Sequence, residues 1–122
     1  MGYFRHKTIV FTSWNFDYLK EVRDKGILIY ERVFKEGGYP CEPHKMFSNF
    51  TGSIVNGQTS FFIAPDGSKE GWEASKLSDE AATELLKWLD NNEENYTDYT
   101  YISFGGDDKI ARVLDNTKEE EE

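Results

Sequence analysis

The stretch KTIVFTSWNFDYLKEVRDKGILIYERVF, residues 7–34, decides the fold because its apolar spacing changes from that of a strand to that of a helix. Residues 7–13 are rich in β-branched and aromatic side chains and are bounded by polar residues, which favours a strand. Ser13 or Asn15 can then cap a helix with its side-chain oxygen. The apolar residues that follow share one helical face; they are Phe16, Leu19, Val22, Ile29, Tyr30, Val33 and Phe34.

Glycines and prolines mark the limits of this helix. Gly26 disfavours the helix by about 1 kcal/mol relative to alanine, so a break is allowed there. The Gly37-Gly38 pair predicts the C-terminal end, because glycine readily adopts the left-handed conformation that closes many helices. Residues 39–45 contain two prolines and are expected to form a loop.

A β-hairpin is predicted next. Asn56-Gly57 tolerates the positive φ angles of a type I′ turn, which is the strongest short hairpin signal. The turn separates a first strand, residues 47–55, from a return strand, residues 58–64. Residues 68–72 can add a short third strand after a Pro-Asp-Gly turn.

A second helix and two more strands complete the pattern. The helix is expected to open at Ser78, and its buried stripe consists of Ala82, Leu85, Leu86 and Leu89. Residues 96–104 and 109–114 form strands on either side of a Gly-Gly-Asp-Asp turn.

These elements follow in the order β-α-β-β-α-β-β, which indicates the α+β class. We expect a mostly antiparallel sheet with the two helices packed on one face. One domain should span residues 1–117, and residues 118–122 should form a solvated acidic tail.

The composition excludes several classes of protein. The chain of 122 residues has a formal net charge of -9, from 14 basic and 23 acidic residues. Such an acidic body disfavours nonspecific binding to duplex nucleic acid. No apolar stretch reaches the ~18 residues that a membrane span needs. No secretory signal is recognised either, so we expect a cytoplasmic protein without membrane contact.

The side chains that could support catalysis or hold a metal are poorly placed for either. Cys41 and His44 have the spacing of half a zinc site, but the chain holds no second Cys and only one other His. The central carboxylates fall in turns and at a helix start, where acidic residues serve as caps; they are Asp66, Glu70, Glu73, Asp79 and Glu80. We therefore expect no enzyme, no cofactor and no metal.

Scarce basic residues and aromatic residues together suggest a ligand site. An arginine fork suits a phosphate, and a flat ring can stack on a base. The candidates from this reasoning are Trp14, Arg23, Tyr99, Tyr101, Lys109 and Arg112. Two structural alternatives stay open: Arg112 pairs with a carboxylate across the sheet, or the rings simply fill the interface between sheet and helices.

Three blocks of the sequence resemble a family of small phage and prophage proteins. The most specific block is SFFIAPDGSKEGW (residues 60–72), and HKTIV (residues 6–10) and TSW (residues 12–14) precede it. Through this family the chain resembles the phage-encoded anti-defence proteins of the Thoeris system. Many members carry a basic residue near the position of Thr59, and its absence here weakens a phosphate contact at that position.

The resemblance implies a function without catalysis. The anti-defence proteins act as oligomers that bind a cyclic ADP-ribose-type immune signal and do not cleave it. Transferred to this chain, their roles place Arg112 at the diphosphate and Asn95 at the edge of the base. We therefore expect a phage counter-defence protein that sequesters a small cyclic nucleotide, as a homo-oligomer, in the cytoplasm of the infected host. The alternative is an acidic inhibitor that docks on a basic host protein.

Overall fold

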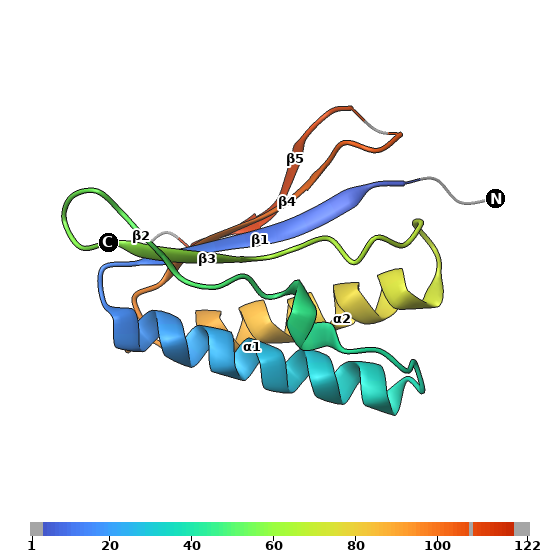
Figure 1. Ribbon diagram of the computed structural model, residues 1–122, viewed down its shortest axis with the longest axis horizontal. Helices are drawn as coiled ribbons and strands as arrows, with labels where there is room; N and C mark the ends of the chain where they lie inside the picture. The colour runs from blue at the N-terminus through green and yellow to red at the C-terminus, as the bar shows by residue number, and fades with distance from the viewer. Residues whose placement is uncertain (1–3, 108, 119–122) are drawn as a thin grey trace.

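The computed structural model describes residues 4–107 and 109–118 (Figure 1). Along the chain its elements are β1 (His6–Ser13), α1 (Phe16–Glu36), the short 3-10 helix η1 (Pro43–Met46), β2 (Thr51–Gly52), β3 (Thr59–Ile63), α2 (Glu73–Asp90), β4 (Asp98–Phe104) and β5 (Arg112–Asn116). Within the described ranges, neither helix is both long and apolar enough to cross a membrane.

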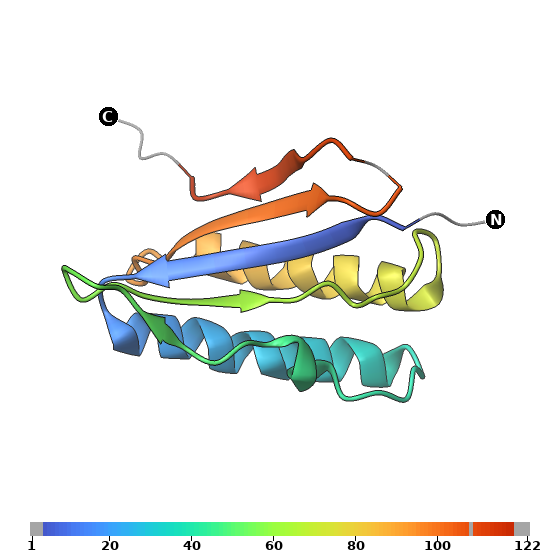
Figure 2. The same cartoon turned by 45° about the horizontal axis from the view of Figure 1, so that its top comes forward.

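The strands form one antiparallel sheet in the order β2-β3-β1-β4-β5. Both long helices lie against the same face, and no described element covers the other face (Figures 1 and 2). The predicted α+β class and the order of the elements are thus confirmed. The first four strands and the two helices have the ferredoxin-like arrangement of two interlocked β-α-β units, and β5 extends the sheet beyond β4.

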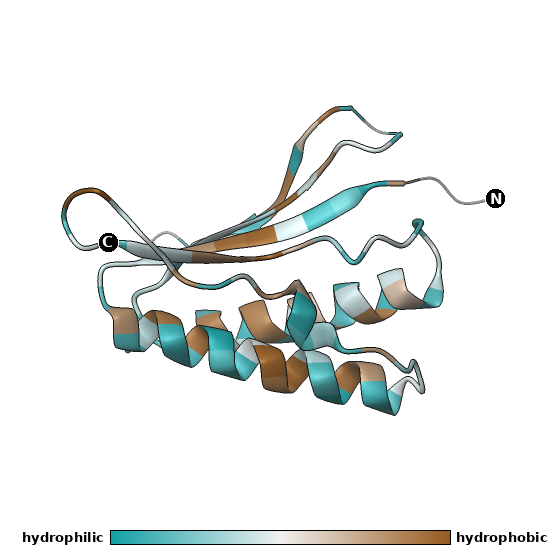
Figure 3. Cartoon of the chain, viewed as in Figure 1, coloured by the Kyte–Doolittle hydropathy of each residue, from teal (hydrophilic) through white to brown (hydrophobic). Residues whose placement is uncertain are grey.

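Alternation along the strands sends one set of side chains toward the helices. In β1, Ile9 and Phe11 are buried while Val10 between them is exposed, and Phe62 of β3 is exposed in the same way. Apolar parts of the helices and of the central strands appear brown in Figure 3. The helix residues that complete the core include Leu19, Val22, Ile29, Tyr30, Val33, Phe34, Ala81, Ala82, Leu85, Leu86 and Leu89.

The first helix begins and ends as predicted. Asn15 is the N-cap, and its Oδ1 accepts hydrogen bonds from two backbone N–H groups of the first turn at 2.9 and 3.3 Å. The helix runs through Gly26 without the break that the sequence allowed. A Cβ at this position would lie 2.8 Å from Cε2 of Phe47 and 3.0 Å from Cδ2 of Leu85. Gly26 therefore permits close packing and does not mark a break.

The second helix begins at Glu73, earlier than its predicted start at Ser78. Ala74 and Leu77 are buried and extend the apolar stripe toward the N-terminus. They lie on the face of Ala81 because spacings of three and four residues share one side of a helix. The prediction failed because it placed the start at a capping residue, whereas the N-cap of α2 forms no side-chain hydrogen bond.

The predicted strand of residues 47–55 is reduced to β2. Phe47 and Phe50 both pack on the ring of Phe61, at centroid distances of 6.4 and 5.8 Å. Side chains three residues apart point to opposite faces of a regular strand. The segment therefore leaves strand geometry so that both rings can reach the core.

The predicted strand of residues 68–72 is reduced to a single bridge between Phe4 and Lys69. The carboxylate of Asp66 accepts hydrogen bonds from the backbone N–H and the hydroxyl of Ser68, both at 2.8 Å. These local bonds hold the segment in a turn and compete with strand pairing.

The remaining predicted turn and strands are confirmed, the strands with shifted limits. Asn56 and Gly57 have the predicted positive φ angles, 63° and 62°. The loop that contains them is closed by a hydrogen bond from the backbone N–H of Ser53 to the carbonyl of Gln58 at 2.8 Å. The predicted strands 96–104 and 109–114 correspond to β4 and β5. Of the predicted acidic tail, Lys118 is described and its four glutamates lie outside the described residues.

Candidate functional site

The start of α1 and the end of α2 lie at the same end of the molecule (Figure 2). A groove of about 830 Å³ is found at this end. Its walls come from the junction of β1 and α1, the last turn of α2, the loop of residues 91–97 and the start of β4. This volume is in the range of small-molecule sites. The lining side chains that matter below are Trp14, Asp90, Glu93, Asn95, Tyr96, Asp98, Tyr99 and Lys118.

Three aromatic rings stand in a row beside the groove. Trp14 meets Tyr18 edge to face at a centroid distance of 5.8 Å, and Tyr18 lies 6.0 Å from Tyr96. Trp14 and Tyr96 are 59% and 57% exposed, so neither ring belongs to the core. Exposed Trp and Tyr side chains are typical of binding surfaces. We call Trp14, Tyr18 and Tyr96 the aromatic row.

The charge of the groove is negative. Three carboxylates line it, those of Asp90, Glu93 and Asp98, whereas Lys118 is the one ammonium among its described lining residues. Lys118 is itself paired with Asp115 and lies 3.8 Å from the Asp90 carboxylate. The hydrogen bond to Asp115 raises the pKa of Lys118. The groove therefore attracts cationic groups and opposes a phosphate.

Tyr99, one of the predicted ligand residues, lines the groove, but its phenol is held within the protein. The side chain is buried, and its hydroxyl donates to Oδ1 of Asp90 at 2.9 Å. Burial and then the hydrogen bond to Asp90 raise the pKa of Tyr99 well above its ordinary value. The neutral phenol thus positions the Asp90 carboxylate at the groove.

Asn95 also lines the groove, and its amide is engaged on every side. Its Nδ2 donates to the carbonyl of Tyr18 at 3.0 Å and to Oε1 of Glu21 at 3.1 Å. Its Oδ1 accepts from the hydroxyl of Thr97 at 2.6 Å. These contacts tie the loop of residues 91–97 to α1. The Asn95 amide would have to give up some of them to form hydrogen bonds with the edge of a base.

Arg23 and Tyr101 lie away from the groove. Arg23 is on α1, where its Nε donates to the carbonyl of Ser48 at 2.9 Å and its guanidinium lies 5.4 Å from the centroid of Phe50. It anchors the segment that precedes β2. Tyr101 points from β4 toward α2, and its hydroxyl is 3.4 Å from Oδ1 of Asp79.

Arg112 and Lys109 lie at the other end of the sheet. Arg112 is the exposed first residue of β5, and Lys109 is exposed in the turn before it. Because β4 begins at the groove and ends at this turn, the length of the strand separates both residues from the groove (Figure 2). Of the predicted ligand residues, the structure brings together Trp14, Asn95 and Tyr99 and leaves the others apart.

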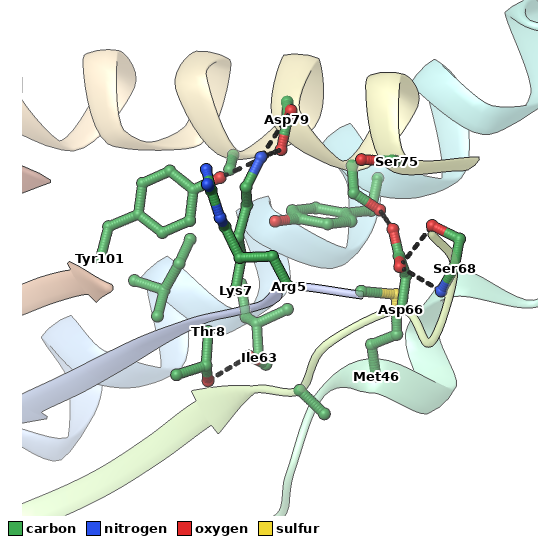
Figure 4. Close-up of a pocket in the computed structure, with 15 residues that line it drawn as sticks. Arg5, Lys7, Thr8, Met46, Ile63, Asp66, Ser68, Ser75, Asp79 and Tyr101 are labelled. Atoms are coloured by element: carbon green, nitrogen blue, oxygen red, sulfur yellow. Dashed lines mark hydrogen bonds and ion pairs between the residues drawn. The ribbon is translucent and has the colours of Figure 1, made fainter. Parts of the chain in front are cut away.

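A second, small and partly open cavity lies between the sheet and α2 (Figure 4). Its volume of about 30 Å³ suits one or two water molecules and not a nucleotide. Lys7 of β1 reaches Glu70 at 3.0 Å and Asp79 at 2.9 Å across it. Burial alone would lower the pKa of Lys7, but the hydrogen bonds to Asp79 and Glu70 outweigh it and raise that pKa.

The block of residues 60–72 builds a wall of this small cavity. Asp66 accepts a third hydrogen bond there, from the hydroxyl of Ser78 in α2 at 2.7 Å. Glu70 joins the same block to Lys7 in β1. The block therefore anchors the loop before α2 to two neighbouring elements, which is a structural role.

The Cys and His side chains that could hold a metal lie apart from the groove. Among the residues that the structure describes, no three His, Cys, Asp or Glu side chains converge as a metal ligand set. Cys41 is exposed. Partial desolvation and the charges of nearby glutamates raise the pKa of its thiol, which disfavours the reactive thiolate. His44 pairs through Nδ1 with Glu31 at 2.9 Å.

Sequence reasoning missed the carboxylates of the groove. Residues 90–98 read DNNEENYTD, and this local density of acidic residues around Tyr96 was the available signal. This signal points to a binding groove only together with Trp14, which the fold alone brings to the same place.

No protein-family model matches the chain, and searches of curated proteins and of solved structures found no match either.

Proposed function

We propose that this protein is a non-catalytic binding protein whose acidic groove and aromatic row dock on a basic surface of another protein. The observation that carries this proposal is the composition of a single groove. Its carboxylates, Asp90, Glu93 and Asp98, lie beside the exposed rings of Trp14 and Tyr96. Complementary charge steers association and sets specificity, and Trp and Tyr anchors supply much of the affinity in many interfaces.

The aromatic row is suited to act as an anchor. Trp14 and Tyr96 contact Tyr18 between them, so their rings are partly ordered before a partner arrives. Less side-chain entropy is then lost on binding. The net charge of -9 adds a long-range attraction for a basic partner.

The resemblance to phage proteins supports a biological setting for this activity. The partner would be a host protein with a basic surface, such as one that normally holds nucleic acid. The bound phage protein would block that surface without any chemical step.

Sequestration of a cyclic ADP-ribose-type nucleotide is the second candidate function. One observation favours it, because Trp14, Asn95 and Tyr99 line the same groove. Trp14 would stack on the base, a contact worth ~1–3 kcal/mol. The groove carboxylates oppose the diphosphate, and Arg112 lies at the other end of β4. We therefore favour the basic protein partner.

Charge reversal at Glu93 tests the preferred function. Wild-type protein is immobilised, host proteins that it captures are identified, and the dissociation constant of each purified partner is measured at low and high salt. We expect a basic partner whose affinity falls with salt and falls about tenfold or more in Glu93→Lys and in Trp14→Ala. Glu80→Lys, an equal charge change at an exposed α2 position, should bind like wild type. Equal binding by all variants would contradict the proposal.

The Glu93→Lys variant also distinguishes the two candidate functions, because they predict opposite changes in binding affinity. Isothermal titration with cyclic ADP-ribose isomers should give no heat if the partner is a basic protein. If the protein sequesters a nucleotide, heat of binding is expected, and Glu93→Lys should tighten it because one repelling carboxylate is removed.

A further inference from the structure

The uncovered face of the sheet is apolar across its centre. Val10 of β1 pairs with Phe62 of β3, and Ile102 of β4 pairs with Val113 of β5. Paired residues of an antiparallel sheet point to the same face. Phe62 is 45% exposed and Val113 is 62% exposed, so the helices do not cover them.

This face is also hollowed. A groove of about 360 Å³ lies on it, and its apolar lining includes Val10, Phe62, Pro65 and Phe104. The hairpin of β4 and β5 rises away from the helices at one side of this face (Figure 1). The face is therefore a shallow trough with room for side chains of another surface.

Charge distinguishes this face from the rest of the molecule. At its paired positions, between His6 at one end and Asp98 at the other, the strands carry hydroxyl or apolar side chains and the amide of Asn116, and no Lys, Arg, Asp or Glu. Two copies of a chain with a net charge of -9 repel each other elsewhere. Only an uncharged face lets a second copy approach without a like-charge contact.

We propose that two copies of this chain associate through these uncovered sheet faces in a symmetric dimer. The five strands are between two and eight residues long and ~4.8 Å apart, so they span a face on the order of 400 Å². Two such faces bury on the order of 900 Å², which matches a weak, reversible dimer.

Edge-to-edge pairing of the sheets suits a second copy less well. At one edge, β2 is two residues long. At the other, a register shift between Tyr101 and Ile102 disturbs the pairing of β5. Short and bulged edges hinder strand addition. The face-to-face dimer also leaves the acidic groove, at the end of the molecule, accessible for a partner.

Sedimentation velocity of the full chain, from about 1 μM to about 1 mM, tests this dimer. We expect a reversible monomer–dimer equilibrium whose dissociation constant rises at least tenfold in Phe62→Glu. Leu28→Glu places the same charge on an apolar side chain of α1 that is 67% exposed, and it should dimerise like wild type.

Circular dichroism is the control for folding. If Phe62→Glu does not fold, Val113→Glu on the edge strand takes its place, because its more exposed side chain contributes less to the monomer core. A wild-type chain that stays monomeric throughout, or a dimer that Leu28→Glu disrupts as strongly as the sheet variants do, would overturn the proposal.

Discussion

Glycine is required at position 26 by its neighbours in the fold and not by the helix that contains it. In an isolated helix, alanine at this position would add about 1 kcal/mol of stability. In the folded protein a Cβ would meet the ring of Phe47 and the side chain of Leu85. The requirement for glycine therefore arises where α1 crosses η1 and α2.

Gly26→Ala should destabilise the protein despite its better helix propensity. We expect a loss of about 1–3 kcal/mol in the free energy of unfolding, because overpacking of a filled core exceeds the gain in propensity. Urea denaturation measures this change. Gly52→Ala is the control, since no atom lies within 4 Å of its Cβ and its φ is ordinary, and it should be nearly neutral. A more stable Gly26→Ala variant would contradict this account of the packing.

At the scale of elements, the start of α1 couples fold and function. The N-cap Asn15 follows Trp14 directly, so the cap that fixes the first turn also fixes the backbone from which the aromatic row begins. Tyr18 of that turn is both a member of the row and, through its carbonyl, an acceptor for Asn95.

Asn15→Ala should cost about 1 kcal/mol of stability, because two N–H groups of the first turn lose their acceptor. Thermal unfolding followed by circular dichroism would show a lower melting temperature. Asn91→Ala, at the C-cap of α2, is the matched control because its cap bonds come from the backbone. Equal effects of the two substitutions would mean that the Asn15 side chain does not stabilise α1.

At the scale of the whole molecule, several proton-binding groups are held in their protonated form by the fold. Burial raises the pKa of Tyr30 and Tyr101 above the ordinary value of 10.0. Lys7 is raised above 10.5 by its two carboxylate partners, against its burial. The unfolded chain releases these protons at lower pH than the folded chain does.

These groups should therefore make their full contribution to the free energy of unfolding below about pH 10. The contribution should fall as the pH rises toward the folded-state pKa values. The slope is at most about 1.4 kcal/mol per pH unit for a fully buried group such as Tyr30. It is smaller for Lys7, which solvent partly screens. Urea denaturation between pH 8 and pH 11 measures it. Tyr101→Phe should reduce the alkaline loss, and an unchanged profile in this variant would exclude Tyr101 as a contributor.

How far the sequence predicts the fold follows from particular elements. The strand at β1, the capped helix α1 and the Asn56-Gly57 turn were all predicted, because each depends on residues close in the chain. The start of α2 and the length of β2 were predicted incorrectly. At these two places, packing in the core determines where Leu77 and Phe47 lie, and the local rules of capping and strand alternation do not.

The candidate site was predicted only in part for the same reason. Side-chain chemistry marked Trp14 and Tyr99 singly, and the family resemblance added Asn95. Arg23 was grouped with them on chemistry alone, and Arg112 on chemistry and the resemblance. The fold places those arginines elsewhere and surrounds the rings with Asp90, Glu93 and Asp98.

The sequence by itself determined the α+β class, the element order and the acidic character, since hydrophobic period, turn chemistry and charge are local or additive properties. Only the tertiary structure decided which side chains share a groove and that one sheet face stays uncovered and uncharged. Those features depend on contacts between segments distant in the chain, and such contacts are set by how the core packs as a whole.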